Sequence, residues 1–130
     1  MSDIEVVYID PFTERTPKKS MAWYNLRGAY LSYKVDVELA NVEVKIDQIE
    51  RNEQDGGKWR WDTPLFDKEV DELIDTIRLS NKLEAVWLKK DGETISILDG
   101  HHRVAAWKKM GNENIPAVVV TVKPKESVYL

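Results

Sequence analysis

The sequence contains no cysteine and only two histidines among its 130 residues. Without cysteine, disulfides, thiolate zinc sites and a cysteine nucleophile are excluded. The two histidines, His101 and His102, are adjacent, and successive side chains on a helix point about 100° apart. We therefore do not expect them to share a zinc ion. A Gly-x-Ser-x-Gly motif is also missing, and with it the usual signature of a serine hydrolase.

Long apolar runs are absent as well. No segment approaches the roughly 20 apolar residues that cross a bilayer, and the N-terminus lacks the basic and apolar regions of a secretory signal. Hydrophobic residues make up 42% of the chain and charged residues 32%, which is typical of a globular domain. We expect a cytoplasmic protein without a membrane partner, folded as one unit at this length.

The net charge of −4 disfavours a protein that coats nucleic acid, because such binding depends on cationic side chains that neutralise phosphates. The charge is unevenly distributed along the chain. Residues 34–75 contain six basic and thirteen acidic side chains, whereas residues 99–130 contain five basic and three acidic ones. An anionic partner is thus expected to prefer the C-terminal third.

Residue patterns predict a mixture of helices and strands. Apolar or alternating stretches predict strands at 4–9, 42–46, 84–89, 94–98 and 115–122, the last in a central position. The expected helices are 21–33, 66–79 and 102–110. Asp67 is expected to cap the second helix, Asn81 to end it in a left-handed conformation, and Gly111 to end the third. Asp91-Gly92 predicts a hairpin turn.

The strongest functional signal is the pentapeptide Asp99-Gly100-His101-His102-Arg103, between an expected strand and an expected helix. The first turn of a helix presents N–H groups and the positive end of the helix dipole, which together favour an anion. Gly100 lets the backbone approach a ligand closely, and Arg103 offers a fork of donors that matches phosphate oxygens. An alternative stays open, in which Asp-Gly is turn chemistry before a helix and the histidines are surface residues.

The sequence Ile95-Ser-Ile-Leu-Asp-Gly-His-His-Arg-Val-Ala-Ala106, followed by Gly111 and Ile115-Pro116, resembles the ParB/sulfiredoxin superfamily. In that superfamily a strand runs into a Gly-x-x-Arg turn, a helix, a glycine and a final strand. The resemblance extends upstream, with 44–49 as the opening strand, 66–79 as the first helix and 83–88 as the next strand.

This resemblance implies an α+β fold, a small mixed sheet with helices packed on it, preceded by an N-terminal extension. The extension would span residues 1–41 and pack on the core. The ParB/sulfiredoxin-like domain would span residues 42–122, and residues 123–130 would form a C-terminal tail.

The residue types at this turn differ between the branches of the superfamily. Partition-type ParB proteins carry Gly-Glu-Arg-Arg there, so the acidic residue and one arginine tied to CTP chemistry are missing from this chain. Sulfiredoxin carries Gly-Cys-His-Arg, so His102 and Arg103 match its phosphate-contacting pair. His101 replaces its reactive cysteine, which excludes reductase chemistry.

The free-serine kinase group shares Asp-Gly-His-His-Arg at this turn. Its similarity extends to Arg51-Asn-Glu53-Gln54, which places Glu53 where the presumed base of that group lies. Glu69 matches a second acid near the start of its helix. Simpler interpretations stay open, with Glu53 as a solvated loop acid and Glu69 as a first-turn acid that complements the helix dipole.

The leading hypothesis is a nucleotide-binding domain that hydrolyses ATP or CTP, or transfers its phosphoryl group, as an NTPase or phosphotransferase. Asp99 would repel a phosphate unless a cation lay between them, so it is a candidate ligand for Mg²⁺. Glu53 would orient or deprotonate the acceptor. The nucleotide itself would be held by Glu69, Gly100, His101, His102 and Arg103.

A nucleic-acid-binding module or nuclease is the first alternative. The polar segment 47–64 is long for a connection in a small domain, which is typical of functional loops. It contains Lys58, Trp59, Arg60 and Trp61, and in an extended segment the two tryptophans would lie on one face and stack on an exposed strand. Such a pair is more often the packing of the loop itself.

A protein-interaction module with a vestigial phosphate site is the second alternative. It would bind its partner through aromatic residues of the N-terminal region, which suit an interface but also suit covering the sheet. These residues are Trp23, Tyr24, Tyr30 and Tyr33.

Overall fold

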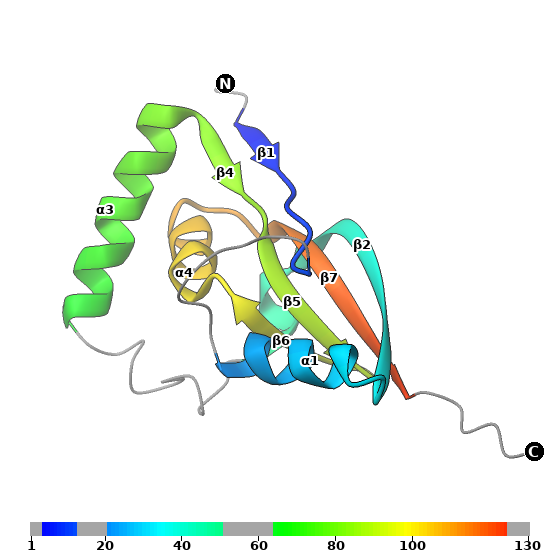
Figure 1. Ribbon diagram of the computed structural model, residues 1–130. Helices are drawn as coiled ribbons and strands as arrows, with labels where there is room; N and C mark the ends of the chain where they lie inside the picture. The colour runs from blue at the N-terminus through cyan, green and yellow to red at the C-terminus, as the bar shows by residue number, and fades with distance from the viewer. Residues whose placement is uncertain (1–3, 13–20, 51–63, 125–130) are drawn as a thin grey trace, which may run out of the picture.

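The computed structural model describes residues 4–12, 21–50 and 64–124. Figure 1 shows how the elements are arranged. In chain order they are β1 (Glu5–Val7), α1 (Met21–Leu31), β2 (Val35–Lys45), the 3-10 helix η1 (Ile46–Gln48), β3 (Ile49–Glu50), α3 (Pro64–Ser80), β4 (Lys82–Glu84), β5 (Val86–Asp91), β6 (Thr94–Asp99), α4 (His101–Lys109) and β7 (Asn114–Pro124). The expected α+β class, with a mixed sheet and helices packed on it, is confirmed.

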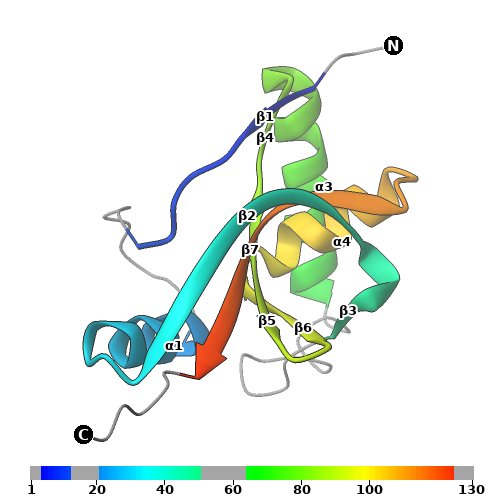
Figure 2. The same cartoon turned by 90° about the vertical axis from the view of Figure 1, so that its right-hand side faces the viewer.

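Five strands form the main sheet, in the order β2-β7-β5-β6-β3. β7 is antiparallel to β2 and parallel to β5, β5 is antiparallel to β6, and β6 is parallel to β3. The β2–β7 pair is long, running from Val35↔Pro124 to Lys45↔Asn114, and Figure 2 shows it curving over the rest of the sheet. β1 and β4 form a separate parallel pair. The expected central position of the last strand is confirmed, since β7 lies between β2 and β5.

The two faces of the sheet are covered by different helices. On one face Trp23 and Leu26 of α1 pack with Trp87, Leu98 and Val118. On the other face α4 contributes a valine to a cluster of strand side chains, which are Val44, Val86, Leu88, Ile97, Ile115 and Val119. α3 packs against α4 and forms an outer layer, as Figure 1 shows at its left.

α3 has the single apolar face that its sequence predicts. Phe66, Val70, Ile74 and Ile77 are buried and spaced by three or four residues, so they fall along one side of the helix. The expectation that Asp67 caps this helix is wrong, because the helix begins at Pro64, whose fixed φ suits the first helical position. Asp67 lies instead in the first turn, where its negative charge interacts favourably with the positive end of the helix dipole.

The ends of two elements follow their sequence signals. Asn81 has a φ of 58° directly after α3, as expected for a left-handed helix end. Gly92 has a φ of 61° at the first of the two positions that connect β5 to β6, which closes the expected hairpin.

The opening strand differs from its expected span of 42–46. β2 starts at Val35, so the expected boundary between residues 41 and 42 falls inside a strand. The additional residues are held by pairing with β7, which local alternation does not reveal. Ile49–Glu50 also form a short strand within a segment expected to be a loop, because they pair in parallel with Ile95 and Ser96 of β6.

Candidate functional site

The candidate phosphate turn lies where β6 passes into α4. Gly100 stands between the two elements with φ 119° and ψ 29°, and its carbonyl accepts the first helical hydrogen bond, from the Val104 N–H at 2.9 Å. A Cβ at Gly100 would lie 2.6 Å from Cγ1 of Val86. Glycine is therefore required here by its positive φ and by the close approach of the turn to β5.

A β-bulge precedes the turn. Trp87 pairs with Asp99 whereas Leu88 pairs with Ile97, so Leu98 is an additional residue in β6. An extra residue bends its strand and re-aims the side chains that follow it. The bulge thus sets the orientation of Asp99 and the direction in which α4 leaves β6.

Arg103 joins the turn to the end of β4. Its Nη1 donates hydrogen bonds to the backbone carbonyls of Glu84 at 2.9 Å and Ala85 at 3.1 Å. Its Nη2 donates to Oδ2 of Asp99 at 2.6 Å, and its side chain is only 15% exposed. Three of the five N–H donors of the guanidinium are therefore directed at protein acceptors, which gives Arg103 a positioning role in the turn.

The two histidines have different environments, as expected from their adjacent positions on a helix. His101 is buried, with 7% of its surface exposed. His102 is partly exposed and faces α3, where its Nε2 lies 2.5 Å from Oε2 of Glu69. The ring of Phe66 stacks on the imidazole of His102, with centroids 4.5 Å apart and planes inclined by 29°. The structure thus brings Glu69 and His102, 33 positions apart in sequence, to one place.

The described residues do not form a metal site on their own. Among residues 4–12, 21–50 and 64–124, no three His, Cys, Asp or Glu side chains are grouped so that they could hold a metal ion. The carboxylate of Asp99 is engaged by Arg103. A magnesium ion that keeps its waters and phosphate ligands needs only one or two carboxylates, so Asp99 fits magnesium only together with a bound nucleotide.

Several expected site residues lie outside the described part of the chain. They are Glu53, Lys58, Trp59, Arg60 and Trp61. Glu50 and Pro64 are the described residues on either side of this segment.

Two features of the site had no direct sequence signal. The first is the set of acceptors of Arg103, because backbone carbonyls carry no residue identity. The second is the stacking of Phe66 on His102, since Phe66 fits the apolar face of α3 and predicts only a core residue. Its position three residues before Glu69, on the same side of a helix, is the one hint that both belong to the site.

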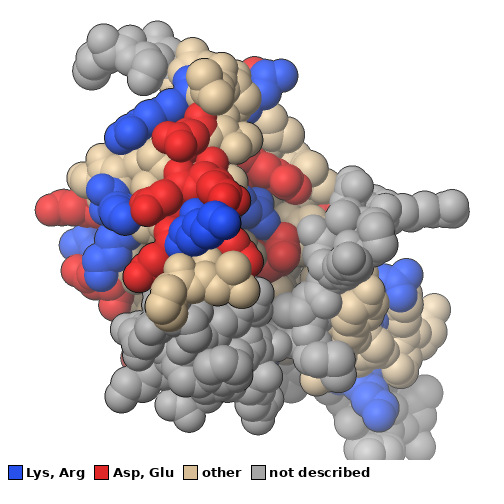
Figure 3. Space-filling model, turned by 90° about the vertical axis from the view of Figure 1, so that its left-hand side faces the viewer, with Lys and Arg blue, Asp and Glu red and all other residues tan. Residues whose placement is uncertain are grey.

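The surface beside the turn is rich in charge. Figure 3 shows acidic and basic side chains interspersed on the α3 side of the molecule. α3 carries five acidic residues, which are Asp67, Glu69, Asp71, Glu72 and Asp75, and two basic ones, Lys68 and Arg78. Among the described residues, α3 therefore does not offer the basic surface that a nucleic acid backbone requires. Among the described helices, none is long and apolar enough to cross a membrane.

Comparison with solved structures gives likenesses of fold. A conserved hypothetical protein from Pyrococcus furiosus has 23% identity and a TM-score of 0.47, over 61% of this chain and 31% of that one. A free serine kinase in complex with ADP has 24% identity and a TM-score of 0.47, over 61% and 30%. Sulfiredoxin from Arabidopsis thaliana has 22% identity and a TM-score of 0.48, over 62% and 83%. The chain spans about a third of the length of the first two proteins.

Comparison with curated proteins gives no match. In the comparison with family models, the model of the ParB N-terminal domain matches residues 33–130. This match covers the sheet from just before β2 to β7, together with the turn between β6 and α4. The chain therefore belongs to the ParB N-terminal domain family.

Proposed function

We propose that the turn from Asp99 to Arg103 binds the phosphates of a nucleotide, ATP or CTP, and that the chain hydrolyses the nucleotide or transfers its phosphoryl group. One observation carries this proposal: α4 begins directly after Gly100 at the end of β6, with His102 on its partly exposed side. N–H groups at a helix start point outward and the helix dipole favours an anion there.

His102 would supply the side-chain contact to phosphate. The cationic form of an imidazole donates from both nitrogens, and a nearby carboxylate favours that form. Glu69, with its Oε2 2.5 Å from Nε2, would hold the ring in place and support its charge. Phe66 restricts the ring further by stacking on it.

Arg103 would serve mainly by fixing the turn. Its bonds to the carbonyls of Glu84 and Ala85 tie α4 to the end of β4, and its bond to Asp99 offsets a negative charge close to the phosphate site. The donors of Arg103 that are not directed at these acceptors would extend to the phosphate. Asp99 would help to hold the magnesium ion that accompanies the nucleotide, which would neutralise charge on the phosphates.

Glu53 would orient or deprotonate the acceptor. The last described residue before it, Glu50, pairs with Ser96, three positions before Asp99. The role of Glu53 as the base rests on the similarity of Arg51-Asn-Glu53-Gln54 to the free-serine kinase group.

Binding is tested by titrating the full chain with ATP and CTP in the presence of magnesium chloride. His102→Asn is the informative variant, because Arg103 has a positioning role whose loss would disturb the turn itself. We expect the intact chain to bind one of the two nucleotides, and His102→Asn to bind it about tenfold more weakly, as for the loss of one charge-assisted hydrogen bond. Absence of binding by the intact chain would overturn the proposal.

Turnover is tested separately with Glu53→Gln. This variant should bind the nucleotide as the intact chain does but should release or transfer phosphate much more slowly, since only the base is removed. Salt-dependent binding of a single-stranded oligonucleotide, lost on replacing Trp59 and Trp61, would instead favour the nucleic-acid alternative.

A further inference from the structure

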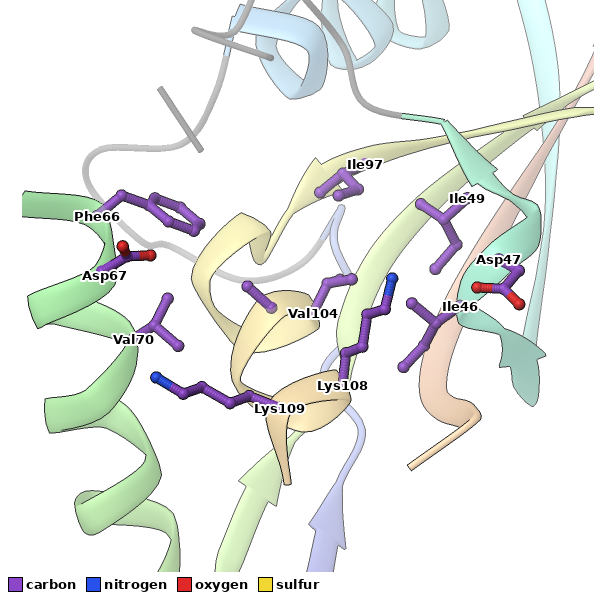
Figure 4. A pocket seen from close by; sticks show the side chains of 11 residues that line it. Ile46, Asp47, Ile49, Phe66, Asp67, Val70, Ile97, Val104, Lys108 and Lys109 are labelled. Carbon is purple, nitrogen blue, oxygen red and sulfur yellow. The ribbon is translucent and has the colours of Figure 1, made fainter. Parts of the chain in front are cut away.

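A groove separate from the phosphate turn opens between α3, α4 and the segment formed by η1 and β3. Its volume is about 640 Å³. Neither His102 nor Glu69 lines it. Six of the residues that line it have large apolar side chains, which Figure 4 labels: Ile46, Ile49, Phe66, Val70, Ile97 and Val104. This size is in the range of pockets that bind small organic molecules.

Four charged side chains line the groove, and one of them, Lys109, is paired with an acid outside the lining. Lys109 donates a hydrogen bond to Asp71 at 2.6 Å, and this bond, with the charge of the same carboxylate, raises the pKa of Lys109. Asp67 lies in the first turn of α3 and also favours the charged form of Lys109. Asp47 is exposed on η1 at the opposite edge.

Lys108 is different from these residues. It has no carboxylate within 4 Å in the part of the chain that the structure describes. Figure 4 shows its side chain extending across the groove, with the ammonium group directed toward Ile49. The methylene stem of a lysine packs well along apolar side chains while its charge stays at the tip. The groove therefore combines apolar side chains with one cation that has no ion partner among the described residues, and the carboxylates of Asp47 and Asp67 lie at its edges.

We propose that this groove binds small organic carboxylates. An apolar ring or chain of the ligand packs on Ile46 and Ile49, above the buried Ile97, and its carboxylate pairs with the ammonium group of Lys108. This site does not depend on nucleotide binding at the turn. It is adjacent to the turn through Phe66, which lines the groove and stacks on His102, so a ligand in the groove contacts a side chain that restrains the candidate phosphate contact.

The experiment follows the three isoleucines of the groove by NMR. The full chain, labelled at the isoleucine methyl groups, is titrated without nucleotide with 4-phenylbutyrate, 4-phenylbutan-1-ol and 4-phenylbutylamine, which share an apolar body and differ in charge. We expect shifts at Ile46, Ile49 and Ile97, which line the groove, but not at Ile115, which is buried elsewhere in the core and does not line it. The carboxylate should bind about three to five times more tightly than the alcohol, as for one exposed ion pair, and the amine no more tightly than the alcohol.

Lys108→Gln should lower the affinity for 4-phenylbutyrate to that for the alcohol. Lys90→Gln, which makes the same charge change at the exposed end of β5, should leave the affinity unchanged. The proposal is overturned if 4-phenylbutyrate leaves the three methyl signals in place, if the amine binds as tightly as the carboxylate, or if Lys108→Gln keeps the preference for the carboxylate.

Discussion

Gly100 lies so close to Val86 that a Cβ on the glycine would come within 2.6 Å of the valine Cγ1 and 2.9 Å of its Cβ. Both valine atoms are fixed in the core, since Val86 is fully buried. The turn between β6 and α4 is therefore seated directly on β5. Any change that lifts this turn also moves the residues proposed to bind phosphate.

Gly100→Ala is expected to destabilise the protein strongly. The side chain must adopt a φ of 119° and also displace Val86, and such overpacking costs about 1–3 kcal/mol beyond the backbone strain. The matched control is Gly111→Ala, which has a φ of 97° but no atom within 4 Å of its Cβ. Urea unfolding of both variants isolates the steric part, and equal losses of stability would show that Val86 yields without cost.

Replacing Arg103 should reduce stability as well as nucleotide binding. Arg103→Met removes the donor to the carbonyls of Glu84 and Ala85 and to the carboxylate of Asp99. Ala85 is fully buried, and an unsatisfied buried acceptor costs about 1–3 kcal/mol. Arg78→Met, on the exposed side of α3, removes the same group without these bonds. Thermal unfolding should therefore separate the two variants, and a similar melting temperature would exclude a positioning role for Arg103.

Glu69→Gln is expected to weaken nucleotide binding at neutral pH. Glutamine keeps a polar group near His102 but does not support the imidazolium. Affinities of the variant and the intact chain for the nucleotide, measured side by side at neutral pH, check this, and tighter binding by the variant would mean that Glu69 repels the phosphates instead.

The ion pair between β2 and β7 gives a prediction for pH dependence. Lys123 donates a hydrogen bond to Glu38 at 2.8 Å, which lowers the pKa of the Glu38 carboxyl below its ordinary value of 4.5. Because the folded pKa is the lower one, the contribution of this pair is present above the unfolded pKa and is lost as the pH falls through the folded pKa. Lys123→Met should return the pKa of Glu38 toward 4.5 in an NMR titration, whereas Lys90→Met should leave it unchanged.

The elements that were predicted correctly are those whose structure depends on residues close together in the sequence. The buried face of α3 follows from four apolar residues at helical spacing, and the β5–β6 hairpin from a glycine that adopts a positive φ. The first half of β2 was not predicted, because its residues are held by β7, almost 90 positions further along at Val35↔Pro124. The short β3 was missed for the same reason, since only its pairing with β6 identifies it.

The candidate site was predicted in part. The pentapeptide from Asp99 to Arg103 was identifiable because a glycine before a helix, followed by histidine and arginine, has a direct chemical meaning. The positioning role of Arg103 was not predicted, since its partners are main-chain carbonyls of β4 and of the residue after β4. The groove beside α4 also had no signal, because its walls are ordinary core residues that the packing of three elements leaves incompletely covered.

The layered arrangement also determines the order in which backbone amide hydrogens exchange with deuterium. α3 packs on α4 and on Leu83 of β4, and its outer side faces solvent, whereas β7 is paired on both edges and buried on both faces. Opening α3 exposes one apolar stripe, while opening β7 divides the sheet. Amides of α3 should therefore exchange through local opening, and those of β7 only when the whole domain unfolds.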